Sequence, residues 1–123
     1  MTFKLSQRSL DRMKGVDERL VNVVKRAIEI SEVDFMVTEG LRTEARQKQL
    51  VAAGASKTMK SKHLVGKAVD LAAVVDGQVR WDWPLYSKIA TAMKRAAEIL
   101  NVKIVWGGDW ITFKDGPHFQ LED

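Results

Sequence analysis

The chain has 123 residues, 46% of them hydrophobic and 29% charged, which is the composition of an ordinary soluble globular protein. It has no cysteine, which excludes disulfides, thiolate metal sites and a cysteine nucleophile. Its formal net charge of +4 suits an anionic partner, but the basic residues are scattered rather than gathered into the stripe of a DNA-binding surface.

The length suits a single domain covering residues 1–123. No apolar run approaches the length of a membrane span, so we expect no membrane insertion. The N-terminal stretch MTFKLSQRSLDRMKG lacks the apolar segment of a signal peptide. We therefore expect a protein that is made in the cytoplasm.

The first half of the chain is predicted to form a helix, a strand and a second helix. Apolar residues recur at helical spacing across residues 17–31, after an acidic first turn. Residues 34–38 alternate in character before a glycine, which predicts a strand. Thr43 can cap a helix that Gly54 ends, and residues 55–66 are predicted to form a loop.

The second half of the chain is predicted to add three strands, two turns and a long helix. In chain order these are strand KAVDLAAVV, turn DGQ, a helix from Asp82 or Pro84 to near Leu100, strand VKIVW, turn GGDW and strand PHFQL. Because the strands are few and short, we expect an α+β fold with a small, mostly antiparallel sheet.

The two histidines of the chain each have an aspartate and a glycine nearby. His63 precedes Asp70 by seven residues, an odd separation that would send the two side chains to opposite faces of a flat strand. A bend at Gly66 would return His63 to the side of Asp70. On the predicted strand, Asp70 shares its face with Ala68 and Ala72, whose small side chains should leave room above the sheet.

A metal site follows if the last strand lies beside the strand of Asp70. His63, Asp70 and His118 would then converge, and two imidazoles with one carboxylate form a three-ligand zinc site of the catalytic type. Asp115, across a Gly-Pro pair from His118, could act as a general base without being a ligand. The alternative is that both histidines are ordinary surface or packed residues. The sequence has no HExxH helix, which would have strengthened the zinc interpretation over this alternative.

Three motifs in order carry a family resemblance. The segment SKHLVGKAVD matches the pattern Ser-x-His-x-x-Gly-x-Ala-x-Asp, and KDGPH supplies a later acid-x-x-His. Together they resemble the zinc D-alanyl-D-alanine peptidases and, more closely, the phage endolysin branch of L-alanyl-D-glutamate peptidases. EGLRTEARQKQLVAAGASKT and WGGDWITFKDGPHFQL resemble further segments of that branch. The resemblance covers residues 33–121 and implies the small α+β zinc peptidase fold shared with lysostaphin-type peptidases and the hedgehog signalling domain.

The resemblance also implies roles for individual residues. One zinc ion per chain would be held by three ligands, which are His63, Asp70 and His118. Asp115 would activate the attacking water and later protonate the leaving amine. Arg42 would bind the substrate and help to stabilise the oxyanion. Gln47 and Ser61 match positions that line the substrate site.

The residues by themselves leave blander interpretations open for these positions. Arg42 could be a surface arginine paired with Glu39 or Glu44, and Gln47 on a helix would usually be solvated. Ser61 could cap a local turn. The large aromatics Trp106 and Trp110 are more often packing residues than substrate platforms.

The function implied is a zinc endopeptidase that cuts the L-Ala–D-Glu bond of peptidoglycan stem peptides, as a phage or prophage endolysin without a separate wall-binding module. It would act as a monomer on the periplasmic wall of the host after a holin-type partner has opened the inner membrane. The lysines around the His63 motif would attract the carboxylate-rich substrate; these are Lys57, Lys60, Lys62 and Lys67.

Three alternatives stay open at this point. A D,D-carboxypeptidase or dipeptidase would use the same metal site with a different pocket. A non-catalytic zinc module could bind the wall or a protein partner, although it would have no use for Asp115 as a base. A basic nucleic-acid-binding protein, which predicts no zinc, is the third; we expect no nucleic-acid partner.

Overall fold

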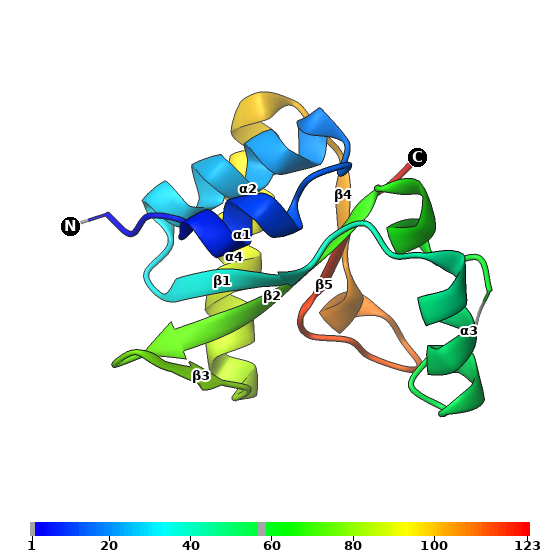
Figure 1. Cartoon of the computed structure of the whole chain (residues 1–123). Coiled ribbons are helices and arrows are strands. Elements are labelled where there is room, and N and C mark those ends of the chain that lie inside the picture. The colour runs from blue at the N-terminus through cyan, green and yellow to red at the C-terminus, as the bar shows by residue number, and fades with distance from the viewer. Residues whose placement is uncertain (1, 57–58) are drawn as a thin grey trace.

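Helices and short strands alternate along most of the chain (Figure 1). The computed structural model describes residues 2–56 and 59–123. Its elements are, in chain order, α1 (Gln7–Arg12), α2 (Glu18–Ile30), β1 (Asp34–Glu39), α3 (Glu44–Ala52), the 3-10 helix η1 (Lys62–Val65), β2 (Ala68–Val75), β3 (Gln78–Arg80), α4 (Trp83–Leu100), β4 (Ile104–Trp106), the 3-10 helix η2 (Gly107–Asp109) and β5 (His118–Leu121).

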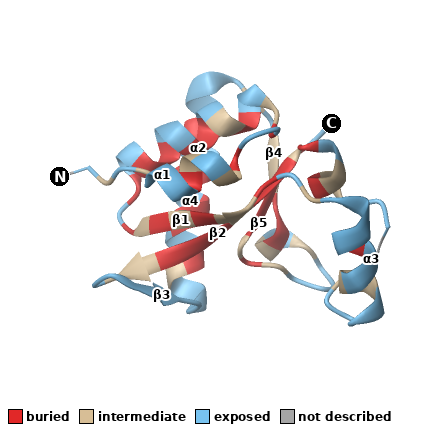
Figure 2. Ribbon diagram, in the orientation of Figure 1, coloured by how far each residue is buried: buried red, intermediate tan, exposed pale blue. Residues whose placement is uncertain are grey.

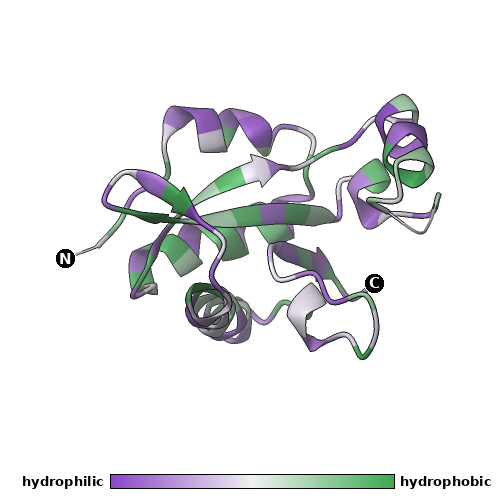
Figure 3. Cartoon of the chain, turned by 90° about the horizontal axis from the view of Figure 1, so that it is seen from below, coloured by the Kyte–Doolittle hydropathy of each residue, from purple (hydrophilic) through white to green (hydrophobic). Residues whose placement is uncertain are grey.

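The strands form one sheet with the order β1-β2-β5-β4, and β3 pairs with β2. Each of these pairings is antiparallel. Helices α2 and α4 pack against each other and α4 contacts β2, whereas α1 lies along β1 (Figure 1). In the view from below, helices lie on both sides of the sheet, and its middle strands are largely hydrophobic (Figure 3). This arrangement confirms the expected α+β fold with a small antiparallel sheet.

The hydrophobic core lies between the sheet and the pair of helices α2 and α4. Alternation along β2 sends Val69, Leu71 and Ala73 into this core, where each is 0% exposed. The buried stripe on the two helices includes Leu20, Val23, Val24, Ala27, Ile89, Met93 and Ala96. Buried segments accordingly concentrate on the sheet and these helices, while α3 is exposed over most of its surface (Figure 2). Within the described residues, none of the helices combines the length and hydrophobicity that crossing a bilayer requires.

The predicted helices and strands are confirmed, with small differences at their ends. The side chain of Asp17 caps α2 by accepting from the backbone N–H of Arg19 at 2.9 Å. The hydroxyl of Thr43 caps α3 in the same way, accepting from the N–H of Arg46 at 3.1 Å. Helix α4 follows Asp82 and has a proline in its first turn, as the sequence indicated.

The sequence pattern missed the shortest elements. Helix α1 has six residues, too few to show a clear apolar period. Strand β3 follows the predicted DGQ turn and forms a hairpin with β2. The 3-10 helix η1 lies inside the segment 55–66 that was expected to be a loop. The predicted GGDW turn likewise contains η2. Such short pieces are stabilised by tertiary contacts rather than by their own sequence.

The expected space on the Asp70 face of β2 is present at Asp70, which lines a cavity, but it does not extend over the two neighbouring alanines. Ala68 and Ala72, which share this face, are both 0% exposed. The Asp70 side chain itself is 19% exposed, and the opening is confined to its immediate surroundings.

A close backbone approach at Gly66 produces the bend between η1 and β2. Gly66 has φ +70°, in the left-handed region, and a Cβ atom there would lie 2.3 Å from the carbonyl oxygen of Gly15. The Gly66 carbonyl also accepts a hydrogen bond from the N–H of Asp17 at 2.7 Å. The start of α2 therefore fixes the turn that the sequence spacing of His63 and Asp70 required.

Replacing Gly66 should destabilise the protein more than replacing a glycine of similar φ in open space. We expect Gly66→Ala to lower the free energy of unfolding by at least about 3 kcal/mol, because left-handed strain and a backbone clash add. Gly54→Ala, at φ +76° with no atom of the described residues within 4 Å of the added Cβ, should cost only about 1 kcal/mol. Urea unfolding followed by circular dichroism measures both, and equal losses would contradict the close approach.

Candidate functional site

Strand pairing brings Asp70 and His118 together. Strands β2 and β5 are paired so that Asp70 lies directly opposite His118. On the other side of β2, Glu39 at the end of β1 lies opposite Asp70, after a register shift that follows Val37. The conditional expectation that the last strand lies beside the strand of Asp70 is confirmed.

His63 reaches the same place from η1. The hydroxyl of Ser61 caps η1 by accepting from the His63 N–H at 3.2 Å, and Gly66 ends it. The carbonyl of His63 accepts from the N–H of Arg42 at 2.9 Å, which ties η1 to the segment after β1. The backbone of this histidine is thus fixed both by near neighbours and by Arg42, which is distant in the sequence.

One carboxylate oxygen lies between the two imidazoles. Oδ1 of Asp70 is 3.2 Å from Nε2 of His63 and 3.3 Å from Nδ1 of His118. The three residues offer ligand atoms that all lie within 4.8 Å of one another. A tetrahedral zinc ion with ligand bonds of about 2.0 Å has ligand atoms about 3.3 Å apart, so both distances to Asp70 suit such an ion.

The outer nitrogens of both imidazoles are already engaged. Nδ1–H of His63 donates to the carbonyl of Gly40 at 2.8 Å, and Nε2–H of His118 donates to Oε1 of Gln120 at 2.8 Å. In the neutral imidazoles the inner nitrogens are then acceptors, and both face a carboxylate. Three acceptors at this separation repel one another unless a cation or protons lie between them, so the donor set fits a metal ion.

The electrostatics of the cluster agree with a preference for positive charge at its centre. Burial alone would raise the pKa of Asp70, but the hydrogen bonds that protonated His118 and His63 would donate to it hold that pKa well below its usual range. Burial would lower the pKa of His118, yet hydrogen bonding and attraction to Asp70 raise it above its ordinary value. Asp70 is therefore anionic, and its negative charge favours a cation at the centre of the cluster.

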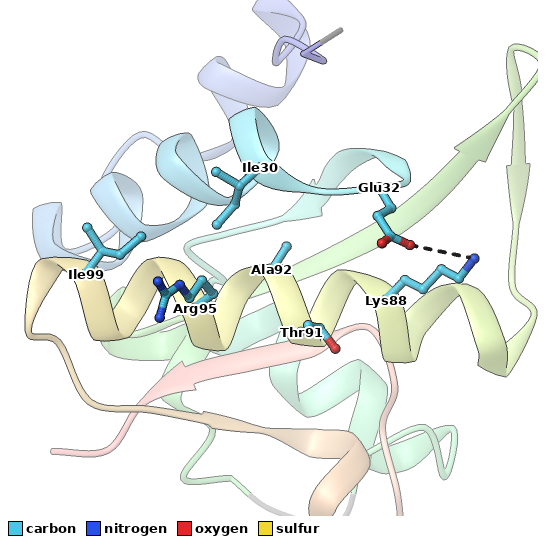
Figure 4. Close-up of a pocket in the computed structure, with 7 residues that line it drawn as sticks. All are labelled: Ile30, Glu32, Lys88, Thr91, Ala92, Arg95 and Ile99. Atoms are coloured by element: carbon cyan, nitrogen blue, oxygen red, sulfur yellow. Dashed lines mark ion pairs between the residues drawn. The ribbon is translucent and has the colours of Figure 1, made fainter.

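The cluster opens into a cavity of about 480 Å³. Predicted site residues that line it are Arg42, Ser61, His63, Asp70, Asp115 and His118. Lys60 and Lys62 are at its rim, whereas Lys67 contacts the C-terminal residue Asp123 and Lys57 lies outside the described residues. Another hollow of similar size, between α2 and α4, is lined by residues unrelated to the predicted site, among them the ion pair of Glu32 and Lys88 (Figure 4).

Asp115 occupies a turn that is held against η2. Its N–H donates to the carbonyl of Gly107 at 3.0 Å, and a Cβ atom on Gly107 would lie 2.4 Å from the Asp115 carbonyl oxygen. This close approach explains the first glycine of the GGDW motif. Burial raises the pKa of the Asp115 carboxyl above its usual range, and the charge of Asp70 raises it further. Asp115 is thereby a stronger proton acceptor than an exposed aspartate.

Arg42 is nearly buried, with its side chain 8% exposed, and several side chains hold it. Its guanidinium donates to both carboxylate oxygens of Glu39 and, at 2.7 Å, to Oε1 of Gln47. Nη2 of Arg42 also lies 3.8 Å from Oδ2 of Asp70. The alternative pairing with Glu39 is therefore present, but it holds Arg42 against the cavity instead of leaving it on the surface.

Gln47 and Ser61 both support neighbouring groups. Gln47 is the buried residue of α3 and is 0% exposed, so the expectation that it would be solvated is wrong. Its amide links Arg42 to Ser56, whose Oγ accepts from Nε2 at 2.9 Å. Ser61 caps η1, as the alternative anticipated, and also lines the cavity. Direct substrate contact by either residue stays a prediction.

The structure adds residues whose part in the site was not predicted from the sequence. Gln120 shares the His118 face of β5 at the i+2 position, a signal that strand alternation offered. The carbonyl of Gly40 carries no such signal. Trp110 lines the cavity, with its ring centroid 5.2 Å from that of His118. Trp106, by contrast, is a packing residue as expected, 8% exposed and donating from Nε1 to the Gly116 carbonyl.

Comparison with known proteins gives consistent matches along the chain. A family described as phage L-alanyl-D-glutamate peptidase matches residues 1–121. The L-alanyl-D-glutamate peptidase of Escherichia phage T5 is 34% identical over 114 residues, covering 89% of this chain and 83% of that protein. The L-alanyl-D-glutamate peptidase of Listeria phage A118 is 32% identical over 124 residues, covering 98% of this chain and 43% of that protein. The crystal structure of the Serratia marcescens L-Ala D-Glu endopeptidase ChiX is similar at a TM-score of 0.92 and 47% identity, covering 98% of this chain and 90% of that chain.

Gln120 should matter for metal affinity although it is not one of the three expected ligands. We expect the wild-type chain to bind about one zinc ion, and Gln120→Leu to weaken binding by about 10-fold to 100-fold, because Nε2 of His118 loses the acceptor that orients the ring. Competition titration against a chromogenic chelator measures both affinities. The control is Gln78→Leu on the exposed strand β3, which should leave the affinity unchanged. Equal affinities for wild type and Gln120→Leu would show that the ring is oriented by other contacts.

Proposed function

The chain belongs to the phage L-alanyl-D-glutamate peptidase family, and from this premise we propose that it is a zinc-dependent endopeptidase that hydrolyses the L-Ala–D-Glu bond of peptidoglycan stem peptides. The observation that carries the metal-dependent part is the shared carboxylate oxygen of Asp70, flanked at 3.2 and 3.3 Å by the nitrogens of His63 and His118. Hydrolysis of this bond is supported by the two phage relatives and the Serratia enzyme, whose names state that specificity.

His63, Asp70 and His118 would hold the zinc ion through Nε2, Oδ1 and Nδ1. Zinc bound there would supply Lewis acidity, which polarises a carbonyl group and acidifies a water molecule. The residues around the cluster keep it in place: Gly40 and Gln120 fix the outer nitrogens, and Gly66 fixes the bend.

Asp115 is proposed as the group that moves the proton. Its carboxylate lines the same cavity as the three ligands, and burial raises its pKa. It would accept a proton from the attacking water as the new C–O bond forms. It would then deliver this proton to the nitrogen of D-Glu as the C–N bond breaks, so that the amine leaves uncharged.

Arg42 is proposed to bind and polarise the substrate beside the metal ligands. Its contacts with Glu39 and Gln47 use three of the five N–H donors of a guanidinium, so the other donors can serve the oxygen that gains charge in the transition state. The stem peptide carries carboxylates on the D-Glu side of the scissile bond. Lys60 and Lys62 at the cavity rim give that side an attractive field.

The biological setting forms part of the same proposal. Two of the relatives are phage proteins, which supports an endolysin that acts on the host cell wall. Action as a monomer, as one catalytic domain, and with a holin-type partner that opens the inner membrane is proposed from the resemblance to endolysins.

The bond itself can be identified on purified peptidoglycan. We expect digestion to release muropeptides with new L-Ala carboxyl termini and new D-Glu amino termini, identified by mass spectrometry. A matched digest with a chelator present should release neither. Loss of a terminal D-Ala would indicate a D,D-carboxypeptidase instead, and new reducing sugar ends would rule out a peptidase.

Asp115→Asn should separate proton transfer from metal binding. The amide keeps the shape of the side chain but cannot accept the proton, so we expect activity to fall by about two to four orders of magnitude with the zinc content unchanged. Asp109→Asn is the matched control, because Asp109 is an exposed aspartate of η2 paired with Lys94 at 2.7 Å. Turbidity assays and metal analysis on the same preparations give both values. Loss of zinc in Asp115→Asn would make Asp115 a ligand.

A further inference from the structure

A second, smaller hollow adjoins the catalytic cavity at Asp115. It has a volume of about 210 Å³ and is lined by Trp81, Trp83, Tyr86, Lys114, Asp115, Gly116 and Pro117. Asp115 lines both spaces, so the aromatic hollow begins where the proposed base stands. We propose that the exposed rings of Trp81 and Trp83 form a subsite for the amino sugar to which the stem peptide is attached. This inference rests on the proposed function and adds a second part of the substrate to it.

The two rings are exposed although they are large and apolar. Trp81 is 58% exposed and Trp83 is 49% exposed, whereas the neighbouring Trp106 is 8% exposed and hydrogen-bonded inside the core. Packing therefore accounts for Trp106 but leaves a broad face of the other two in water. Tryptophans half in solvent beside a hollow are common at binding sites, because they offer large contact areas at little entropic cost.

The rings are also held in place before any ligand arrives. The ring centroid of Trp81 lies 6.1 Å from that of Tyr86, and the centroid of Trp83 lies 6.5 Å from Tyr86 and 6.3 Å from Trp106. A Cβ atom on Gly116 would come within 3.3 Å of the Trp83 ring, so this ring rests on the turn that carries Asp115. Binding at such a surface loses little side-chain entropy.

The chemistry of the substrate places a sugar on one side of the scissile bond. In peptidoglycan the nitrogen of L-Ala forms an amide with the lactyl group of the amino sugar, so only one amino acid separates the sugar from the bond that is cut. One extended residue spans about 3.5 Å, and the sugar must therefore lie on the surface next to the catalytic groups. That amide carries no charge, and the C–H faces of a pyranose ring suit the faces of aromatic rings.

The charges around the site indicate which end of the substrate lies in which hollow. Lys60 and Lys62 line the catalytic cavity beside the ion pair of Arg42 with Glu39, and these two lysines suit the carboxylates that follow the scissile bond. The hollow beyond Asp115 is aromatic, with Lys114 as the lysine in its lining. The substrate would thus run from the tryptophans, past Asp115 and the metal ligands, towards the basic rim.

The test compares two substrates that differ in the sugar alone. One is the stem tripeptide acetylated on L-Ala, and the other is the same tripeptide attached to its disaccharide. For wild type we expect a lower KM on the disaccharide substrate. Trp81→Ala should raise that KM about tenfold and leave kcat/KM on the sugar-free tripeptide unchanged, whereas Trp81→Phe should restore most of the loss. The control is Val79→Ala, which alters an exposed apolar residue of β3 and should leave KM and kcat unchanged on both substrates.

A binding measurement on metal-free protein is independent of turnover. Titration with the free disaccharide should change the tryptophan fluorescence of wild type and have a much smaller effect on Trp81→Ala. If Trp81→Ala loses kcat/KM equally on both substrates, or on neither, the sugar subsite is overturned while the peptidase activity of wild type still stands. If wild type cuts neither substrate, the proposed function fails, and the titration still decides whether the tryptophans bind the sugar.

Discussion

A single oxygen atom organises the site of this protein. Oδ1 of Asp70 lies 3.2 Å from one imidazole nitrogen and 3.3 Å from another, in a largely buried position. A carboxylate and two lone pairs at this separation repel one another unless positive charge lies between them. The fold must therefore hold the three groups together against their own repulsion until a cation binds, and most of the unusual features nearby serve that purpose.

The restraints come from parts of the chain that have little else in common. The carbonyl of Gly40 and the amide of Gln120 hold the outer nitrogens of the histidines, and the ion pair of Arg42 with Glu39 stands beside the carboxylate. Gly66 brings η1 back towards β2 through a contact with the start of α2, where any side chain would clash. Since a misplaced ligand weakens both binding and catalysis, such supporting contacts are as necessary as the ligands.

Around this rigid centre the surface is divided by charge and by polarity. Lys60 and Lys62 line the cavity beside the ion pair of Arg42 with Glu39, and exposed aromatic rings line the hollow beyond Asp115. A peptide with carboxylates on one side of the scissile bond and an uncharged sugar on the other has the same division. The proposed base stands between the two regions, where the bond to be cut would lie. Substrate orientation can thus follow from electrostatics and ring contacts.

The sequence by itself determined the features that depend on near neighbours. Thr43 and Asp17 mark the starts of helices, because a capping side chain bonds to a backbone N–H within three residues. Strand alternation alone puts His118 and Gln120 on one face. Motif spacing pointed to His63, Asp70, His118 and Asp115. Only the tertiary structure decided that β5 pairs with β2, which joins residues 48 positions apart. It also decided that Gln47 is buried behind Arg42 and that the carbonyl of Gly40 accepts a hydrogen bond from His63. These contacts depend on which strands pair to enclose a common core, and burial of that core is a property of the whole chain that no local pattern contains.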